Sequence, residues 1–266
     1  MKIGVSSYTW VWGVGIKGFE PVRPLGAQEL VDKAKQSGVG VLQIADNPRL
    51  HEMDEFSLDE LVTKADACGI ELEVGTRGIE PEHLLRYLRI AKKIKSKIVR
   101  TITHRLDEEA TAWMKEVLSE YEKEGISIAL ENHDEYKTAE LAGFIERLGN
   151  PYLGVCLDTV NSFAALEPPD IVVKTLGPFT LNLHVKDFDV VRVRSQLGFS
   201  IQGRPAGKGR LDIPGIVSLL HEMGRDPNAI LELWTPFEEN IEKTVEKEEL
   251  WAEESLYYLR AVIPGA

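Results

Sequence analysis

Short runs of apolar residues recur along the whole chain and alternate with helical patterns, at intervals of about 25 to 40 residues. Most of these runs are rich in valine, isoleucine and leucine, as buried parallel strands are. We predict eight strands, at residues 2–7, 39–45, 71–75, 97–102, 126–131, 153–157, 180–185 and 229–233. Eight strand–helix units with no extra strand favour a closed (β/α)8 TIM barrel over an open doubly wound sheet, which has about five to seven strands.

The intervals between the predicted strands carry helical signals. Residues 81–95 form an apolar stripe with proline at the first turn, which suits a helix N-terminus. Ser57 and Glu60 have the spacing of a capping box, so we expect a helix to open at Ser57. The pattern over 244–260 provides the last helix, which would close the outer ring.

Length and composition are consistent with one barrel domain spanning 1–266, since such barrels use about 250 residues. The chain is 43% hydrophobic and has no apolar run near the roughly 20 residues of a membrane helix. The net charge of −12 disfavours nucleic acid as a partner. With two cysteines and no signal-peptide pattern, we expect a cytoplasmic protein without disulfides.

Polar residues follow four successive predicted strands at the point where each strand ends. They are Glu131, Asp158, His184 and Glu232, spaced 27, 26 and 48 residues apart. The carboxyl ends of barrel strands face the active site, so these groups should converge there. Three carboxylates and one imidazole would repel each other unless a divalent cation neutralises them. Each residue alone could instead close a strand with an ion pair, cap a turn or sit as a satisfied core histidine.

We therefore predict a metal site made of these four residues. The set offers hard oxygen atoms and one nitrogen, which suits Mn²⁺, Mg²⁺ or Co²⁺ better than the thiolate-rich sites of structural zinc. Mn²⁺ is the first choice, and Mg²⁺, Co²⁺ or Zn²⁺ are the alternatives.

Four segments carry a resemblance to a known family. Residues 130–134 (LENHD), 155–162 (VCLDTVNS), 183–187 (LHVKD) and 203–212 (GRPAGKGRLD) resemble the xylose isomerase-like TIM barrels. That superfamily includes sugar phosphate isomerases and epimerases, D-tagatose 3-epimerases, hydroxypyruvate isomerases, inosose dehydratases and endonuclease IV proteins. The resemblance spans essentially the whole chain and is stronger in the second half.

In the keto-sugar epimerases of this superfamily, the metal ligands correspond to Glu131, Asp158, His184 and Glu232 here, and the two glutamates are also the acid/base pair. The resemblance thus implies that Glu131 and Glu232 are catalytic. One departure stands out, because the epimerases place a substrate-binding histidine where this chain has Asn161. Asparagine can hydrogen-bond a substrate oxygen but does not titrate near neutral pH.

Further candidates for substrate binding lie near these residues. His133 follows Glu131 by two positions, and Lys186 follows His184 by two positions. Arg204 corresponds to an arginine that reaches the substrate in related barrels. It belongs to a cationic segment after the seventh strand that could hold an anionic substrate or be a solvated loop, and that segment contains Lys186, Arg192, Arg194, Arg204, Lys208 and Arg210. Weaker candidates at the same rim are Asp46, Asn47, Thr76, Arg77, Arg100 and His104.

The predicted function is a divalent-metal-dependent isomerase or epimerase of a keto-sugar, sugar phosphate or sugar acid, acting through a metal-stabilised enediolate. The same ligands would serve a lyase on a sugar acid, either a 3-oxo acid decarboxylase or an inosose-type dehydratase. The ligands alone do not separate these reactions. A sugar-binding barrel without chemistry is a remote alternative.

Two other readings are disfavoured. An endonuclease IV-like enzyme would need more histidines at strand ends and a basic face. The glycines of 13–18 match a dinucleotide fingerprint, but prolines follow where a helix is required, so we expect a flexible first loop. The expected partner is a small carbohydrate. Homologous barrels often associate, so a homo-oligomer is compatible with the resemblance, although no sequence feature shows an interface.

Overall fold

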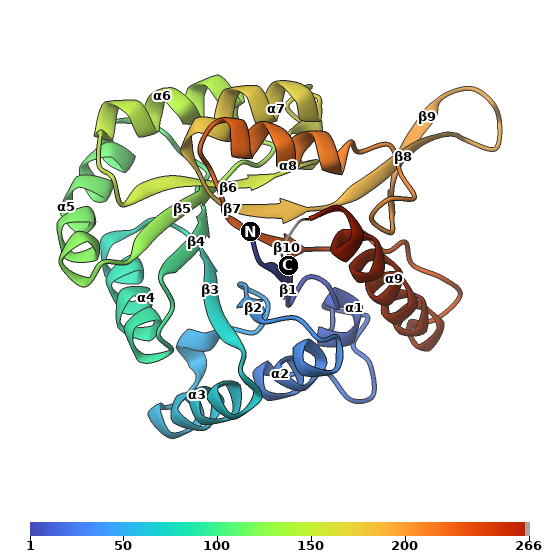
Figure 1. Ribbon diagram of the computed structural model, residues 1–266, viewed down its shortest axis with the longest axis horizontal. Coiled ribbons are helices and arrows are strands. Elements are labelled where there is room, and N and C mark those ends of the chain that lie inside the picture. Colours follow the sequence, from blue (N-terminus) through green and yellow to red (C-terminus); the bar gives the residue numbers. More distant parts are fainter. Residues whose placement is uncertain (264–266) are drawn as a thin grey trace.

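Eight parallel strands close into a ring in the computed structural model, which describes residues 1–263 (Figure 1). The order around the ring is β1-β10-β7-β6-β5-β4-β3-β2. The first and last of these strands pair, with Val5 in register with Leu231, so the two ends of the chain complete the ring. The predicted (β/α)8 barrel is confirmed. The ring strands are β1 (Ile3–Ser6), β2 (Val41–Ile44), β3 (Glu71–Arg77), β4 (Ile98–Ile102), β5 (Ser127–Glu131), β6 (Leu153–Asp158), β7 (Thr180–Val185) and β10 (Asn228–Leu231).

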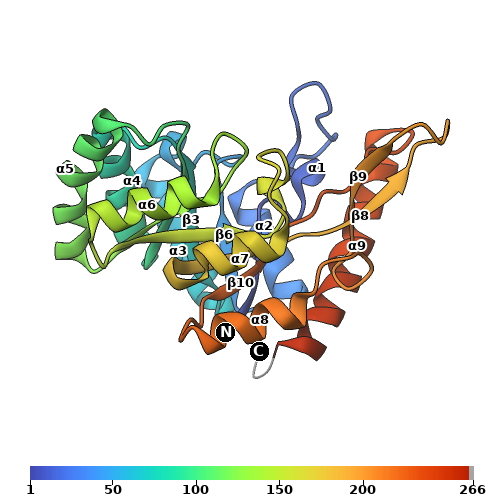
Figure 2. The same cartoon turned by 90° about the horizontal axis from the view of Figure 1, so that it is seen from above.

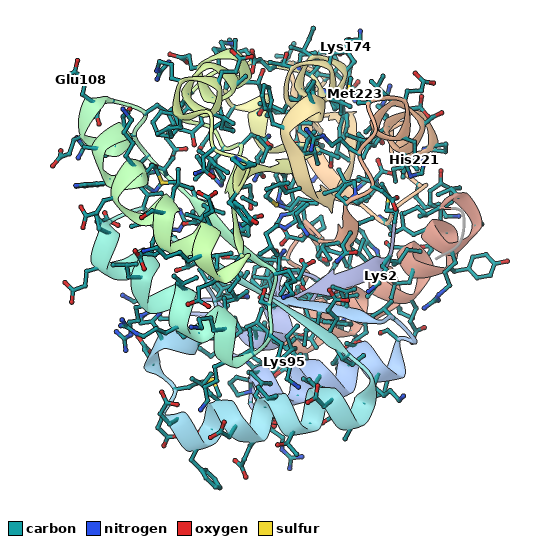
Figure 3. All side chains as sticks on the ribbon, turned by 60° about the vertical axis from the view of Figure 1, so that its left-hand side comes forward. Lys2, Lys95, Glu108, Lys174, His221 and Met223 are labelled. Atoms are coloured by element: carbon teal, nitrogen blue, oxygen red, sulfur yellow. The ribbon has the colours of Figure 1, made fainter. Side chains whose placement is uncertain are left out.

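Helices surround the ring and turn charged residues such as Glu108 and Lys174 to the outside (Figure 3). Their inner faces are apolar, and Leu30, Phe144 and Leu259 are fully buried. Burying one such side chain contributes about 2 kcal/mol. The helices are α1 (Val11–Val14), α2 (Ala27–Gln36), α3 (Glu55–Cys68), α4 (Pro81–Lys93), α5 (Glu108–Glu124), α6 (Thr138–Leu148), α7 (Pro169–Leu176), α8 (Ile213–Glu222) and α9 (Ile241–Val262), with short 3₁₀ turns at Leu50–Glu52, Asn161–Phe163 and Gly177–Phe179. Of the helices in residues 1–263, none combines the length and the apolar character needed to span a bilayer.

The start of α3 differs from the sequence prediction. The helix begins at Glu55, and Asp54 caps it by accepting a hydrogen bond from the backbone N–H of Ser57 at 2.7 Å. Ser57 therefore occupies the third helical position and is not the cap. Aspartate is about as good a helix cap as serine, so Asp54 caps the helix three residues before the predicted position.

A β-hairpin follows β7 directly and was missed by the prediction of eight strands with no extra strand. It consists of β8 (Asp187–Arg192) and β9 (Phe199–Arg204), which pair antiparallel and extend away from the ring (Figure 2). Gly203 lies against the backbone of Trp234, where an added Cβ would stand 2.1 Å from the carbonyl oxygen. A glycine is needed for this close approach. The predicted cationic loop is thus an ordered ribbon up to Arg204.

The first loop is also more regular than predicted. It contains the short helix α1, and Ile16 and Phe19 form an isolated antiparallel bridge. Gly15 has a φ angle of 107°, which residues other than glycine rarely adopt. The side chain of Trp10, which directly precedes α1, is buried.

Candidate active site

A cavity of about 380 Å³ opens at the carboxyl ends of the ring strands. Barrel enzymes have their active sites at this face. The lining combines charged, amide and aromatic side chains. The cavity is lined by Tyr8, Val11, Trp12, Arg77, Arg100, Ile102, Glu131, His133, Asn161, Lys186, Glu232, Leu233, Trp234 and Thr235.

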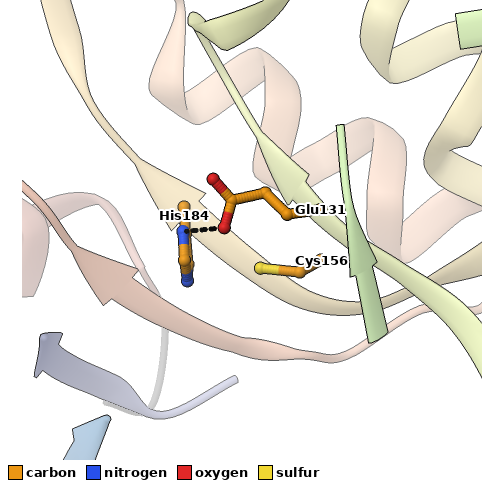
Figure 4. Close-up of side chains that lie close together, drawn as sticks. All are labelled: Glu131, Cys156 and His184. Carbon is orange, nitrogen blue, oxygen red and sulfur yellow. Dashed lines mark ion pairs between the residues drawn. The ribbon is translucent and has the colours of Figure 1, made fainter. Parts of the chain in front are cut away.

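The four predicted metal ligands lie together at this face. Glu131 and Asp158 end β5 and β6, His184 lies in β7 in register with Asp158, and Glu232 follows β10. All four are at most 1% exposed. The Nδ1 atom of His184 is 3.4 Å from Oε2 of Glu131 (Figure 4), 3.9 Å from Oδ2 of Asp158 and 3.4 Å from Oε2 of Glu232. Three acidic oxygens from three strands thus surround one imidazole nitrogen.

The second oxygen of each carboxylate is held by a neighbouring group. Oε1 of Glu131 accepts a hydrogen bond from the Asn161 amide at 2.7 Å, and Oε1 of Glu232 accepts one from the Ser6 hydroxyl at 2.8 Å. Oδ1 of Asp158 accepts hydrogen bonds from the backbone N–H groups of Val160 and Asn161 in the turn that follows it. These bonds fix the carboxylates so that their remaining oxygens point toward His184.

The donor set fits a divalent cation. His184 is fully buried, yet its Nδ1 has no hydrogen-bond partner, which is rare for a buried polar atom. Ligand atoms of Asp158, His184 and Glu232 lie within 4.8 Å of one another, and so do those of Glu131, Cys156 and His184. Burial raises the pKa of the Cys156 thiol well above its usual range, so this sulfur stays protonated. The carboxylates and His184 are therefore the better ligands.

Lys186 supplies a positive charge inside the site. Its Nζ lies 2.7 Å from Oδ2 of Asp158 and 2.8 Å from Oε2 of Glu232. Burial alone would lower the pKa of Lys186, but the adjacent carboxylates outweigh it and raise the pKa above its usual range. Burial would likewise raise the pKa of Glu232, but His184 and Lys186 hold it well below its usual range. Lys186 and Glu232 therefore form a buried ion pair.

Arg100 is the second buried cation of the site. Its Nε forms an ion pair with Glu131, and its Nη1 donates to Oδ1 of Asp46 at 3.1 Å and to the carbonyl of Thr76 at 3.2 Å. Arg77 contacts Asp46 from the other side at 3.4 Å. Burial would raise the pKa of Asp46, but Arg100 and Arg77 hold it below its usual range. Asp46, Arg77 and Arg100 were weaker sequence candidates, and the structure connects them to Glu131.

The predicted substrate-binding residues lie in different places. Asn161, His133 and Lys186 line the cavity. Arg204 is outside the lining, on β9, where its Nη1 donates to the carbonyl of Gly203 at 3.0 Å and its Nη2 lies 3.8 Å from Asp189.

The other cations of the segment after β7 are also outside the lining. Arg210 pairs with Asp189 at 2.6 Å, and Lys208 pairs with Glu254 at 3.2 Å. The guanidinium of Arg192 stacks 4.5 Å from the ring of Phe199. These contacts stabilise the hairpin and its base.

Aromatic side chains, those of Tyr8, Trp12 and Trp234, form part of the cavity lining. Trp12 contacts Phe19 edge-to-face, with ring centroids 5.9 Å apart, and Phe237 at a tilted angle, with ring centroids 5.3 Å apart. The buried carboxylate of Glu248 accepts the backbone N–H groups of Trp12 at 3.1 Å and Gly13 at 3.0 Å. Burial raises the pKa of Glu248 to about 8. No sequence signal singles out Glu248, because α9 contains many glutamates.

Fold and side chains together define a TIM barrel whose mouth holds a carboxylate and imidazole set of the kind that binds a divalent cation. The chain belongs to the xylose isomerase-like TIM barrel family, because the sequence model of that family matches residues 21–262. The predicted family is confirmed.

Individual relatives extend this assignment. The chain is 34% identical over 271 residues to the 3-oxo-isoapionate decarboxylase of Pectobacterium atrosepticum, with 100% of this chain and 98% of the relative covered. A crystal structure of D-psicose 3-epimerase in the presence of D-fructose superposes with a TM-score of 0.75 at 17% identity, covering 100% of both chains. A xylose isomerase-like barrel from Mycobacterium smegmatis in complex with magnesium has a TM-score of 0.70 at 15% identity, covering 97% of each chain. The chain is an enzyme of this family.

Proposed function

We propose that the protein is a divalent-metal-dependent lyase that decarboxylates a 3-oxo sugar acid. The observation that carries the metal-dependent chemistry is the convergence of three carboxylate oxygens on the unpartnered Nδ1 of His184. The full-length similarity to a 3-oxo-isoapionate decarboxylase supports this reaction. The lyase, which was the alternative in the sequence prediction, thereby becomes the first proposal.

Decarboxylation of a 3-oxo acid breaks the bond between the carboxylate carbon and the neighbouring carbon, and the electron pair moves onto the 3-oxo oxygen. A divalent cation held by Glu131, Asp158, His184 and Glu232 would stabilise the negative charge on that oxygen. Carbon dioxide leaves, and a proton must then be added to the carbon to which the carboxylate was bonded. Lys186 holds such a proton at Nζ, 2.8 Å from Oε2 of Glu232. These two residues form the proposed proton-transfer pair.

The charges around the cavity favour an anionic substrate. The site contains three cations, Arg77, Arg100 and Lys186, and four carboxylates, on Asp46, Glu131, Asp158 and Glu232. A bound divalent ion changes this excess of one negative charge into an excess of one positive charge. A sugar monoanion neutralises that excess, whereas a neutral ketose does not. This balance supports a sugar acid as the substrate.

An isomerase or epimerase is the second candidate. Glu131 and Glu232 come from strands that are separated by β6 and β7, so they approach the cavity from different sides. Such an arrangement suits proton transfer on two faces of a substrate carbon. Asn161 counts against the epimerase, because its amide does not ionise near neutral pH and is hydrogen-bonded to Glu131.

Nuclear magnetic resonance in D₂O separates the two reactions. The chelated protein is loaded with Mn²⁺, Mg²⁺, Co²⁺ or Zn²⁺ and offered 3-oxo sugar acids, ketoses and sugar phosphates. We expect metal-dependent release of carbon dioxide from a 3-oxo acid, with one deuterium at the carbon that lost it. Deuterium uptake without carbon loss would select the isomerase. Undiminished turnover after complete chelation would contradict both.

Arg77 is the candidate for binding the substrate's carboxylate. Its guanidinium lines the cavity, and its side chain is 45% exposed. Arg77→Gln is expected to raise KM for a sugar acid about tenfold with a smaller change in kcat, because a charge-assisted hydrogen bond is lost. Steady-state kinetics measures this. Arg49→Gln removes an arginine that is 63% exposed and outside the cavity lining, and serves as the control. Equal KM values for the two variants would contradict this role.

A further inference from the structure

A second layer of polar side chains lies inside the ring, beneath the candidate metal ligands. It contains Gln43 of β2, Glu73 of β3, Asn182 of β7 and Asn228 of β10. Hydrogen bonds join Glu73 to Asn182 and Asn228, although β3 is not a neighbour of β7 or β10 in the ring. These bonds therefore cross the barrel interior. None of these four residues was a candidate from the sequence, and none takes part in the proposed chemistry.

Glu73 is the acceptor on which the layer is centred. Its Oε2 accepts the amide groups of Gln43 at 3.0 Å and Asn182 at 2.9 Å, and its Oε1 accepts that of Asn228 at 2.7 Å. The side chain is almost fully buried, and burial raises the pKa of Glu73 while the three amides oppose that shift. Each of the three amides must turn its nitrogen toward the carboxylate of Glu73, since an amide oxygen in that position would be repelled.

The orientation of Gln43 has a consequence for His184. With its amide nitrogen bonded to Glu73, Gln43 presents its Oε1 to Nε2 of His184 at 2.7 Å. An oxygen acceptor there requires the imidazole to carry its proton on Nε2. The lone pair of the neutral ring is then on Nδ1, the atom surrounded by Glu131, Asp158 and Glu232.

We propose that Glu73 is a positioning residue that, through Gln43, holds His184 in the Nε2–H tautomer and leaves Nδ1 free to bind the metal ion. This inference rests on the proposed metal-dependent function. Replacing a group that orients a metal-binding histidine commonly lowers metal affinity by about 10-fold to 100-fold. A layer that merely filled the barrel would not determine which ring nitrogen carries the proton.

The test uses the full chain, free of metal and labelled with ¹⁵N in histidine. Long-range ¹H–¹⁵N spectra of the wild-type protein, recorded at a pH high enough that the imidazole ring is neutral, are expected to show His184 as the Nε2–H tautomer. Glu73→Gln replaces a pure acceptor by a group that also donates, so Gln43 can turn over. We expect a shift of His184 toward the Nδ1–H tautomer, and Co²⁺ affinity reduced at least about tenfold in calorimetric titration.

A matched control lies on the same strand. Glu71 precedes Glu73 by two residues, is 41% exposed at its side chain and pairs with Lys2. Glu71→Gln is expected to leave both the His184 tautomer and the Co²⁺ affinity unchanged.

Transposing the two groups provides a rescue. In the double variant Gln43→Glu with Glu73→Gln, a carboxylate accepts directly from Nε2 of His184, so the Nε2–H tautomer should return and Co²⁺ affinity should recover to within about threefold of wild type. If Glu73→Gln does not fold alone, this variant decides, and loss of both readouts in it overturns the proposal.

The outcomes for metal and for tautomer are separable. Folded Glu73→Gln protein with the Nε2–H tautomer and Co²⁺ affinity within twofold of wild type would refute the role of Glu73. Wild-type protein that shows the Nε2–H tautomer but binds no Co²⁺ would refute the proposed metal-dependent function instead, while leaving the control of the tautomer in place.

Discussion

Replacing Glu232 by glutamine is expected to lower kcat about a thousandfold, in the range found when a group that moves protons is removed. The carboxylate lies 3.4 Å from Nδ1 of His184 and 2.8 Å from Nζ of Lys186. Glutamine keeps the shape and the bond from the Ser6 hydroxyl, but it removes the negative charge that both neighbours contact. The fold should therefore survive while turnover is lost.

Release of carbon dioxide measures turnover of this variant, and circular dichroism with thermal unfolding checks the fold. Glu239→Gln is a suitable control, because Glu239 is 75% exposed and pairs with Lys243 on the surface. It should behave as wild type. Full turnover by the Glu232→Gln protein would exclude Glu232 from the proposed proton-transfer pair.

Replacing Lys186 by methionine is expected to lower the unfolding free energy of the metal-free protein by about 3 to 5 kcal/mol, the usual cost of removing one partner of a buried ion pair. Methionine fills a similar volume but leaves Asp158 and Glu232 buried without a cation between them. A divalent ion would restore the missing charge. The stabilisation on adding Mn²⁺ should consequently be larger in the variant than in wild type.

Denaturant unfolding with and without chelator measures both quantities for Lys186→Met. The control is Lys174→Met, at an exposed lysine that pairs with Asp170 along α7. Exposed pairs contribute at most about 1 kcal/mol, so little change is expected there. If the two variants were equally stable without metal, the buried lysine would not be neutralising the site.

The barrel was predictable because its strands are buried on both faces and appear in the sequence as continuous apolar runs. The hairpin was not predictable in the same way. Residues 187–204 are largely half-buried or exposed and rich in charge, and only Lys186 separates β7 from β8. A ribbon of this composition has the pattern of a solvated loop, and its pairing depends on the turn between Arg192 and Phe199.

The predicted site followed from one rule, that polar residues at the ends of barrel strands face the same cavity. Glu131, Asp158 and Glu232 satisfy that rule directly. Gln43 and Glu73 lie within their strands, and which neighbours they meet across the ring depends on the tilt and stagger of all eight strands. Arg204 was chosen because related barrels have a substrate-contacting arginine at the corresponding place, and here it lies on the hairpin outside the cavity lining.

The pairing of β1 with β10, which closes the ring, is also required to complete the candidate site. Ser6 and Glu232 meet across 226 positions, and bringing residues so distant along the chain together carries a loop-closure cost. The strands β5, β6 and β7 pair with one another and carry Glu131, Asp158 and His184, whereas Glu232 depends on Ser6 of β1 for the hydrogen bond that holds its Oε1. The candidate site therefore depends on both ends of the chain, although its other acids come from the middle of the sequence.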